Sequence, residues 1–305
     1  MAEPSFQCVP NFSEGRRSEI IAGIADAIRS VTGVRLIDYS ADRDHNRCVM
    51  TLLGSAEPLF EAMLCATRYA LQHIDLRSHR GIHPRSGAVD VLPIVPLGRA
   101  TRKDAVALAQ RIGTALAQEF ALPVYFYEWA SQPGRPSALP LLRKGGFEAL
   151  IDLPLLGDRA PDIGPAKAHP TAGIAIVGAR PPLVAYNINL FSSDVEKAKQ
   201  IAKQIRRERN TRPELEGVRA LGLFLDSQNR AQVSMNLTCP NKTPLPSLFD
   251  TVQEFASALG VAVAESEIIG AIPLASLGGK PPSVIRWHSY RPSQILETWL
   301  PDETP

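Results

Sequence analysis

The order of strands and helices is clearest in residues 183–205, which read LVAYNINLFSSDVEKAKQIAKQI. Residues 183–190 are mostly apolar, and Asn187 and Asn189 alternate with Tyr186, Ile188 and Leu190, which is typical of a strand. Ser193 and Asp194 then mark the start of a helix, because short polar side chains cap helix N-termini. The helix carries one apolar stripe, formed by Val195, Ala198, Ala202 and Ile205. We therefore expect a strand that leads directly into an amphipathic helix.

The elements that follow complete a βαββαβ unit. Two strands are predicted at 218–225 and 232–238, separated by a polar turn at 226–230. A strand also begins at Val261, after a second helix whose apolar stripe consists of Leu248, Phe249, Val252 and Phe255. This order is the ferredoxin-like arrangement, in which helices cover one face of a largely antiparallel sheet.

The first half of the chain repeats this order without close sequence similarity. Its strands are predicted at 6–9, 34–39, 48–54, 88–95 and 124–127. Helices begin near Ser18 and before Leu59. A further helix begins at Thr101, where Asp104 forms an acidic variant of the capping box.

We therefore predict an α+β fold with two ferredoxin-like subdomains, each a mainly antiparallel sheet with helices on the outer face. If each sheet keeps its other face clear of helices, the two sheets can face each other across a ligand cleft. A chain of 305 residues is long enough for two such domains. The predicted boundaries are an N-terminal subdomain at 1–180, a C-terminal subdomain at 181–277 and a C-terminal arm at 278–305.

Composition favours a small-molecule partner. The chain has 33 basic and 31 acidic residues and a formal net charge of +2, so its overall field gives no reason to expect nucleic acid or a membrane as a partner. Cys8, Cys48, Cys65 and Cys239 lack the CxxC spacing of zinc sites, and no disulfide framework is expected. The N-terminus has no signal-peptide pattern, and no run of about 18 apolar residues occurs. We expect a cytoplasmic protein without a metal.

Residues 79–90, HRGIHPRSGAVD, have the composition of a site. His83 is the first candidate for proton transfer, because imidazole is the side chain whose ordinary pKa lies near neutrality. Pro84 fixes the backbone beside it, and His79 is interpreted as a structural donor. The alternative is an ordinary loop, whose Gly, Pro and charged residues are there because they form turns and not because they form a site.

A catalytic histidine is usually held in one tautomer by a carboxylate or a carbonyl group on its other nitrogen. Asp38, Asp75 and Asp90 are the candidates by their strand and loop positions. Each could instead be a turn or cap residue, and the residues alone do not choose among the three.

Several short sequence motifs in the chain resemble those of the glutamate formiminotransferase family. They are CVPNFSEG at 8–15, DHNR at 44–47, GPAKAHPTAG at 164–173, YNINL at 186–190 and QVSMNLT at 232–238. The match runs in the family's order from about Cys8 to about Leu277. Family members have two subdomains, each a sheet with external helices, and bind folate between them, so the resemblance implies the same architecture here.

The resemblance implies a folate-dependent transferase that moves a formimino group from N-formimino-L-glutamate to N5 of tetrahydrofolate, in histidine degradation. The attacking nitrogen must lose a proton as its bond to the amidine carbon forms, so a base is required. The family's catalytic histidine stands in a His-Pro-Arg word, which is His83 here. Tetrahydrofolate is implied as co-substrate, without a metal. A homodimer is also expected, with any cyclodeaminase a separate protein.

Binding residues follow from the family pattern and from the donor's chemistry. The family's folate-binding segment matches Gly164, Pro165, Ala166, Lys167, Ala168, His169, Pro170, Thr171, Ala172 and Gly173. Arg47 and Arg85 are candidate clamps for the donor's carboxylates, or else surface ion pairs. Two pairs of residues alternate along strands, so each projects from one sheet face as candidate folate contacts or as cross-strand partners. These pairs are Asn187 with Asn189 and Asn236 with Thr238.

Two positions depart from the family pattern. Members carry an acid immediately before the histidine of the His-Pro-Arg word, where this chain has Ile82, and a methionine where it has Ser86. A carboxylate at the first position could contact a cationic amidine, and Ile82 cannot. The alternatives are therefore a glutamate formyltransferase acting on 5-formyltetrahydrofolate, or a non-catalytic folate-binding homologue.

Overall fold

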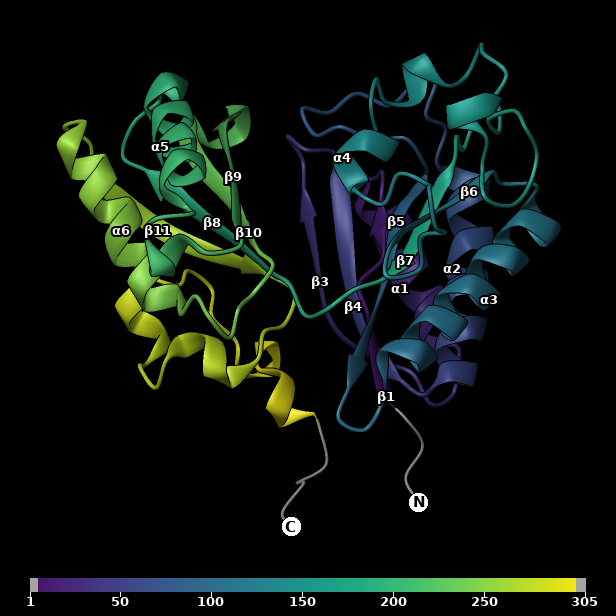
Figure 1. The fold of residues 1–305 in the computed structure, drawn as a ribbon, viewed down its shortest axis with the longest axis horizontal. Helices are drawn as coiled ribbons and strands as arrows, with labels where there is room; N and C mark the ends of the chain where they lie inside the picture. The colour runs from purple at the N-terminus through teal and green to yellow at the C-terminus, as the bar shows by residue number, and fades with distance from the viewer. Residues whose placement is uncertain (1–4, 300–305) are drawn as a thin grey trace. The chain divides into compact units, whose positions relative to one another are not determined.

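The chain divides into two compact units, Met1–Arg180 and Pro181–Pro305. The structure is a computed structural model that describes residues 5–299, and its path is drawn in Figure 1. Each unit has its own sheet and its own helices. The two units are described separately below.

The first unit begins with a βαββαβ order. Its elements in this part are β1 (Ser5–Cys8), β2 (Asn11–Phe12), α1 (Ser18–Arg29), β3 (Arg35–Asp42), β4 (Arg47–Gly54), α2 (Ala56–His73) and β5 (Val89–Leu97). The strands β3, β4, β1 with β2, and β5 lie side by side, and each adjacent pair is antiparallel. This is the strand arrangement predicted for a ferredoxin-like subdomain.

An extension follows this core of the first unit. It consists of α3 (Arg102–Phe120), β6 (Val124–Glu128), α4 (Leu139–Leu142) and β7 (Ala175–Ala179). β7 inserts between β5 and β6 and pairs in parallel with both, which makes a seven-stranded sheet among the described residues. The sheet is therefore mainly antiparallel with a parallel edge. The sequence interpretation contained neither β7 nor the short β2.

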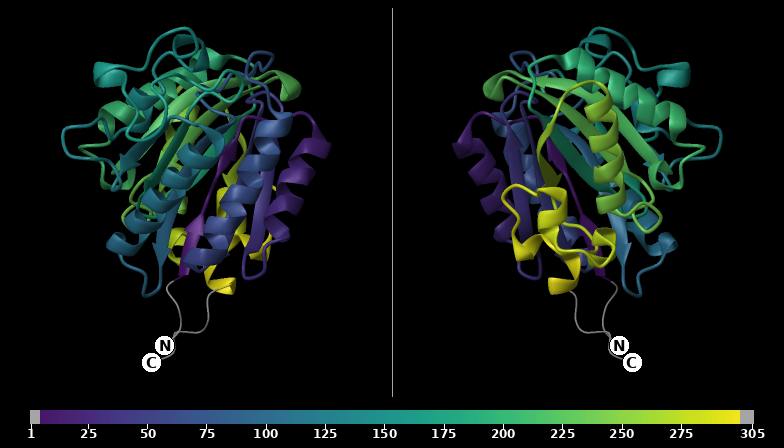
Figure 2. Two further views of the ribbon diagram at one scale, coloured as in Figure 1. Left: turned by 90° about the vertical axis from the view of Figure 1, so that its right-hand side faces the viewer. Right: turned by 90° about the vertical axis from the view of Figure 1, so that its left-hand side faces the viewer.

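Helices cover one face of this sheet. α1, α2 and α3 lie side by side on it, as the left view of Figure 2 shows. Alternate strand residues such as Phe6, Met50 and Ile94 are buried against these helices. The opposite face is partly covered as well, because Leu150, Leu155 and neighbouring side chains pack on Tyr125 and Ile176. That cover comes from the segment 139–168, which connects β6 to β7.

The start of α3 confirms the capping box predicted at Thr101 and Asp104. The side chain of Thr101 accepts a hydrogen bond from the Asp104 amide, and the Asp104 carboxylate accepts one from the Thr101 amide, 2.8 Å away. This reciprocal capping box satisfies donors that the first turn of α3 would otherwise leave free.

The second unit has the ferredoxin-like order throughout. Its elements are β8 (Val184–Leu190), α5 (Val195–Glu208), β9 (Val218–Leu225), β10 (Arg230–Leu237), α6 (Leu245–Ala258) and β11 (Val263–Ile269). The strand order within the described part is β11-β8-β10-β9, and every adjacent pair is antiparallel. α5 and α6 bury the apolar sides of these strands, including Tyr186, Ile188 and Val233. The α+β prediction with two ferredoxin-like units is confirmed.

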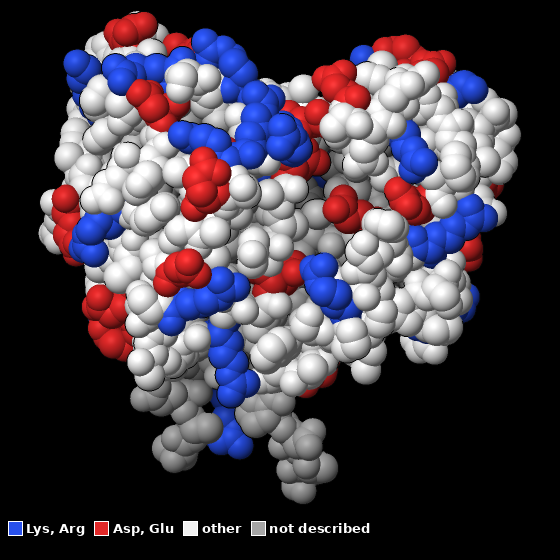
Figure 3. Space-filling model, turned by 180° about the vertical axis from the view of Figure 1, so that it is seen from behind, with Lys and Arg blue, Asp and Glu red and all other residues white. Residues whose placement is uncertain are grey.

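Residues after β11 pack on the second unit as short 3-10 turns. Trp287 and Ile295 join its core, and isolated parallel bridges link Ser266 to Trp287 and Ile272 to Ile295. Charged side chains of both signs are interspersed on the face drawn in Figure 3. Among the described helices, none is long and apolar enough to cross a membrane.

Candidate functional site

The loop that carries His83 is docked on the turn between β3 and β4. Asn46 joins the two segments, because its side chain donates to the Arg80 carbonyl at 2.9 Å and accepts from the Gly15 amide at 2.9 Å. The Ile82 amide donates to the Asp44 carbonyl at 3.1 Å. Gly81 lies so close to this turn that an added Cβ would come 2.3 Å from the His45 carbonyl oxygen. These contacts fix the position of the His83 loop against the β3–β4 turn.

His83 is half-buried, and its Nδ1 atom has two polar neighbours. The Pro84 carbonyl oxygen is 2.7 Å away and Nη1 of Arg47 is 3.0 Å away. A proton on Nδ1 would be donated to the carbonyl, which leaves Nε2 as the acceptor needed in a general base. The carbonyl option of the sequence prediction is thus the one found. The ring of His45 lies beside His83, with 5.6 Å between the ring centroids.

Arg47 joins His83 to a buried carboxylate. Its Nη1 lies 3.2 Å from Oδ2 of Asp90, and its Nε donates to Oδ1 of Asn11 at 2.9 Å. Its Nη2 also donates to the Asn11 oxygen. Asn11 and Arg47 point away from the helices, because Phe12 and Cys48, their neighbours in the chain, belong to the helix-covered core. These side chains therefore lie on the helix-free face of the sheet.

Asp90 organises both the loop and the cations. Its Oδ1 accepts hydrogen bonds from the amides of Ser86 at 2.8 Å and Gly87 at 3.3 Å. Its Oδ2 accepts from Arg47 and from Nη2 of Arg143. The side chain is only 1% exposed. This candidate acid contacts Arg47, the arginine beside His83, and two amides of the His83 loop. Asp75 instead pairs with Arg77 at 2.6 Å.

Burial and positive charge keep His83 neutral. Loss of hydration is the main cause, and the guanidinium groups of Arg47 and Arg143 add to it, so the pKa of His83 falls to about 2. Burial is also the main reason that the pKa of Arg47 falls to about 10, which still leaves Arg47 charged at neutral pH. The imidazole can therefore accept a proton, and negative charge brought near the two arginines would make it a stronger base.

Arg85 lies apart from this cluster. Its Nε donates to Nδ1 of His79 at 2.8 Å, and its two terminal nitrogens bind Glu148 at 2.8 and 2.6 Å. Nε2 of His79 is 2.7 Å from the Asn46 carbonyl oxygen. His79 therefore has the structural position expected for it, while Arg85 forms an ion pair that holds the loop to the segment after α4.

The segment 164–173 lies in the first unit and ends against the His83 loop. His169 and Gly173 exchange two backbone hydrogen bonds of 2.9 Å, which form a tight turn. The Ala88 amide donates to the Ala172 carbonyl at 2.9 Å. Gly173 has φ of +70°, and an added Cβ would come 2.1 Å from the Ser86 carbonyl oxygen. The second half of this segment is thus anchored to the loop that carries the candidate base, at Ser86 and Ala88.

The four polar strand residues lie in the second unit. Asn187 and Asn189 are on the helix-free face of β8 and approach Glu267 and Glu265 at 3.4 and 3.3 Å. Asn236 is exposed on β10. Thr238 follows the last residue of β10, and its hydroxyl donates to the Gly217 carbonyl at 2.9 Å. Cross-strand bonding, the alternative interpretation, therefore accounts for the present contacts of the asparagines of β8.

Sequence reasoning missed three members of the cluster around His83. Asn11 and His45 lie inside the sequence motifs that carry the family resemblance. The motifs therefore included both residues, but nothing in the sequence assigned them a function. Arg143 had no signal, because it follows a proline-rich stretch and meets Asp90 only in the fold. The two departures from the family pattern differ in exposure, since Ile82 is 43% exposed and Ser86 is fully buried.

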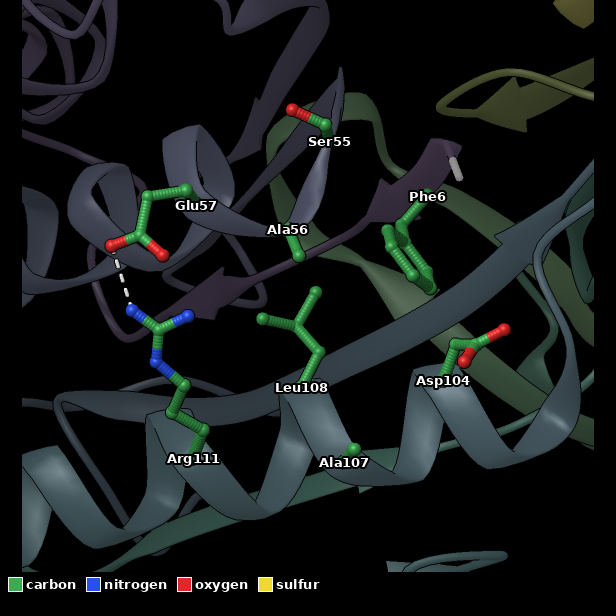
Figure 4. A pocket seen from close by; sticks show the side chains of 8 residues that line it. All are labelled: Phe6, Ser55, Ala56, Glu57, Asp104, Ala107, Leu108 and Arg111. Carbon is green, nitrogen blue, oxygen red and sulfur yellow. Dashed lines mark hydrogen bonds and ion pairs between the residues drawn. The ribbon is translucent and has the colours of Figure 1, made fainter. Parts of the chain in front are cut away.

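Two other features of residues 5–299 add no chemistry to this cluster. No group of three or more His, Cys, Asp or Glu side chains is placed to hold a metal ion. A surface hollow of about 470 Å³ lies between the start of α2 and α3. Figure 4 shows its lining, including the ion pair of Glu57 and Arg111 at 2.7 Å. None of the residues that line it belongs to the His83 cluster.

The first unit thus carries a histidine with a lowered pKa, bordered by arginines that contact a buried carboxylate, and perturbed ionisable groups of this kind are typical of functional sites. The N-terminal subdomain of the formiminotransferase domain matches residues 5–180, and the formiminotransferase domain matches residues 185–279. The chain belongs to the formiminotransferase family, which confirms the resemblance seen in the sequence.

Named relatives agree with this assignment. Glutamate formimidoyltransferase of Streptococcus pyogenes serotype M1 is 40% identical over 272 residues, which cover 89% of this chain and 90% of that protein. Glutamate formimidoyltransferase of Thermoplasma acidophilum is 38% identical over 95% of both chains. Formimidoyltransferase-cyclodeaminase of Sus scrofa is 39% identical over 89% of this chain and 50% of that longer protein.

Proposed function

We propose that this protein is a glutamate formimidoyltransferase that moves a formimino group from N-formimino-L-glutamate to N5 of tetrahydrofolate. The observation that carries the proposal is the position of the His83 imidazole, held between the Pro84 carbonyl and Arg47 in a chain that resembles enzymes named for this reaction. The reaction belongs to histidine degradation. Tetrahydrofolate is a co-substrate, and no metal takes part in the proposed steps.

The proposed chemistry needs one proton acceptor. N5 of tetrahydrofolate attacks the amidine carbon of the donor, and a new N–C bond forms. The proton of N5 passes to Nε2 of His83 and then to the glutamate nitrogen, while the bond between that nitrogen and the amidine carbon breaks. The products are 5-formiminotetrahydrofolate and glutamate. A positioned base of this kind typically contributes about 100- to 10,000-fold to the rate.

Binding roles are proposed for two parts of the chain. The segment 164–173 is proposed to bind folate, because its anchored end adjoins the loop of His83. In the second unit, Asn187, Asn189, Asn236 and Thr238 are proposed folate contacts. The proposed division is an N-terminal subdomain at 1–180, a C-terminal subdomain at 181–277 and an arm at 278–305. We also propose a cytoplasmic homodimer.

Steady-state assays test the function. The parent protein should form 5-formiminotetrahydrofolate from formiminoglutamate and tetrahydrofolate, and His83→Ala should lower kcat by about 100- to 10,000-fold. His73→Ala is the matched control, since His73 lies on α2 and its ring stacks on Tyr69. Binding of tetrahydrofolate without turnover in the parent would instead support the non-catalytic homologue.

One observation favours testing a second donor. Ile82 places an exposed apolar side chain where the family pattern has an acid, so a cationic amidine finds no carboxylate there. The same assay with 5-formyltetrahydrofolate and glutamate distinguishes formyl transfer from formimino transfer. A larger kcat/KM for the formyl reaction would overturn the proposed donor and leave the role of His83 in place.

A further inference from the structure

Arg143 lies near the candidate base, and one of its buried nitrogen atoms has no hydrogen-bond partner among residues 5–299. It follows α4 in the segment that covers part of the sheet, and its Nη2 donates to Oδ2 of Asp90. Its side chain is only 10% exposed. Its Nε atom is buried and has no hydrogen-bond partner within residues 5–299. A buried guanidinium donor without an acceptor is unfavourable, so this atom is suited to an oxygen that arrives with a ligand.

The charge balance around Arg143 also favours an anion. Asp90 is the carboxylate that both Arg47 and Arg143 contact, so two positive charges share one negative charge. Asn11 is neutral and accepts from Nε and Nη2 of Arg47. The Nη1 of Arg47 already faces Asp90 and His83. Arg47 therefore has every nitrogen engaged, whereas Arg143 has a donor to spare.

The geometry points to Arg143 as the residue that binds a carboxylate of the glutamyl donor and holds that donor beside His83. This assignment rests on the proposed function for the identity of the ligand. A guanidinium suits this role because its planar donors match the two oxygens of a carboxylate. Arg47, one of the two candidate clamps in the sequence, would instead fix the position of His83 and Asp90.

Carboxylate binding at Arg143 would also act on the base. Four groups from different elements face the His83 ring: Arg47 on β4, Arg143 after α4, His45 in the β3–β4 turn and the Pro84 carbonyl in its own loop. A carboxylate on Arg143 offsets one of the two permanent positive charges. The donor would thereby make His83 a better proton acceptor at the moment the acceptor is needed.

Arg143→Gln tests the assignment, with Lys144→Gln as the control. Both changes remove one positive charge at adjacent positions, but Lys144 is exposed. We expect Arg143→Gln to raise the KM for formiminoglutamate by about 10- to 100-fold, since hydrogen bonds to charged groups have this weight. The KM for tetrahydrofolate should stay within about twofold, and Lys144→Gln should change neither constant. A donor KM within twofold of the parent's would overturn the assignment.

Two further measurements keep the test decisive. If circular dichroism shows that Arg143→Gln does not fold, Arg143→Lys replaces it. An ammonium group lacks the paired planar donors of a guanidinium, so the KM for the donor should still rise several-fold. Calorimetric titration with L-glutamate reports on Arg143 without turnover. If the parent has no transferase activity, the proposed function fails, but glutamate binding that weakens in the variant still supports Arg143. A parent that binds neither glutamate nor formiminoglutamate overturns the assignment.

Discussion

The guanidinium of Arg47 borders the imidazole of His83, with 3.0 Å between Nη1 and Nδ1. A permanent cation at this distance opposes protonation of the ring. Asp90 limits this effect, because its carboxylate lies 3.2 Å from the same Nη1 atom. The protonation state of His83 therefore depends on a small network of fixed charges, and the network can be tested one member at a time.

His83 should stay neutral in mildly acidic solution. Burial, Arg47 and Arg143 lower its pKa from 6.5 to about 2. Between these values the unfolded chain binds one more proton than the folded protein, so this histidine makes the folded state less stable as the pH falls from 6.5. We expect the His83 ring signals in NMR spectra, assigned by their loss in His83→Gln, to keep their neutral positions down to about pH 4. A titration midpoint between about pH 6 and pH 7 would contradict this.

Asp90→Asn should destabilise the first unit. The amide keeps an oxygen for the Ser86 and Gly87 amides but leaves Arg47 and Arg143 without their shared counter-charge. Breaking a buried ion pair in this way typically lowers the free energy of unfolding by about 3–5 kcal/mol. Urea denaturation measures the loss. Asp75→Asn is the control, because it removes an exposed pair and should cost much less. Equal effects of the two changes would show that Asp90 is not a central partner.

Arg47→Gln should lower both stability and activity. The change removes hydrogen bonds to Asn11 and Asp90 and takes the guanidinium away from His83. We expect a loss of about 3–5 kcal/mol, typical of a broken buried pair, with kcat reduced because the ring is no longer fixed. Thermal unfolding and steady-state assays measure the two effects. Arg111→Gln is the control, since it removes an exposed ion pair with Glu57. Equal losses of stability and activity in the two variants would show that Arg47 does not hold His83 in place.

Gly173→Ala should disrupt the junction of the segment 164–173 with the His83 loop. Its added Cβ would come 2.1 Å from the Ser86 carbonyl oxygen. Gly157 also has a positive φ, of +58°, but nothing lies within 4 Å of its added Cβ. Both substitutions therefore carry backbone strain of roughly 1 kcal/mol, and only Gly173→Ala adds a collision. We expect it to lose at least about 2 kcal/mol more in urea denaturation and to bind tetrahydrofolate more weakly. Equal losses would rule out the contact.

Local patterns were sufficient for most of the fold. The stripe of α5 and the capping box at Thr101 and Asp104 are set by residues close in the chain. The capping box is present as predicted, and the buried stripe contains Ala198, Ala202 and Ile205 as predicted together with Ile201, whereas Val195 is only partly buried. β7 was missed for a physical reason. Its residues, Ala175–Ala179, are short and mostly small, and they become a strand because β5 and β6 leave a gap between them. That gap exists only once the sheet has formed.

Some residues of the candidate site are indicated by the sequence, and others are brought together only by the fold. His83 could be singled out as a candidate from the sequence because a histidine among Gly, Pro and Arg is a distinctive local pattern. Asp90 was one of three possible acids, and only the fold shows that its oxygens meet the loop amides and the arginines. Arg143 is 53 residues from Asp90 in the chain, and no spacing rule joins them. The predicted facing of the two sheets across a ligand cleft stays a prediction.

β7 is the last strand of the first unit along the chain, yet it occupies an interior place in the sheet. A nascent polypeptide that has left the ribosome only as far as β6 therefore presents bare backbone edges on both β5 and β6. Those edges are closed only when Ala175–Ala179 emerges, after the whole covering segment has been synthesised. Chaperone dependence and misassembly during translation should therefore concentrate in that interval.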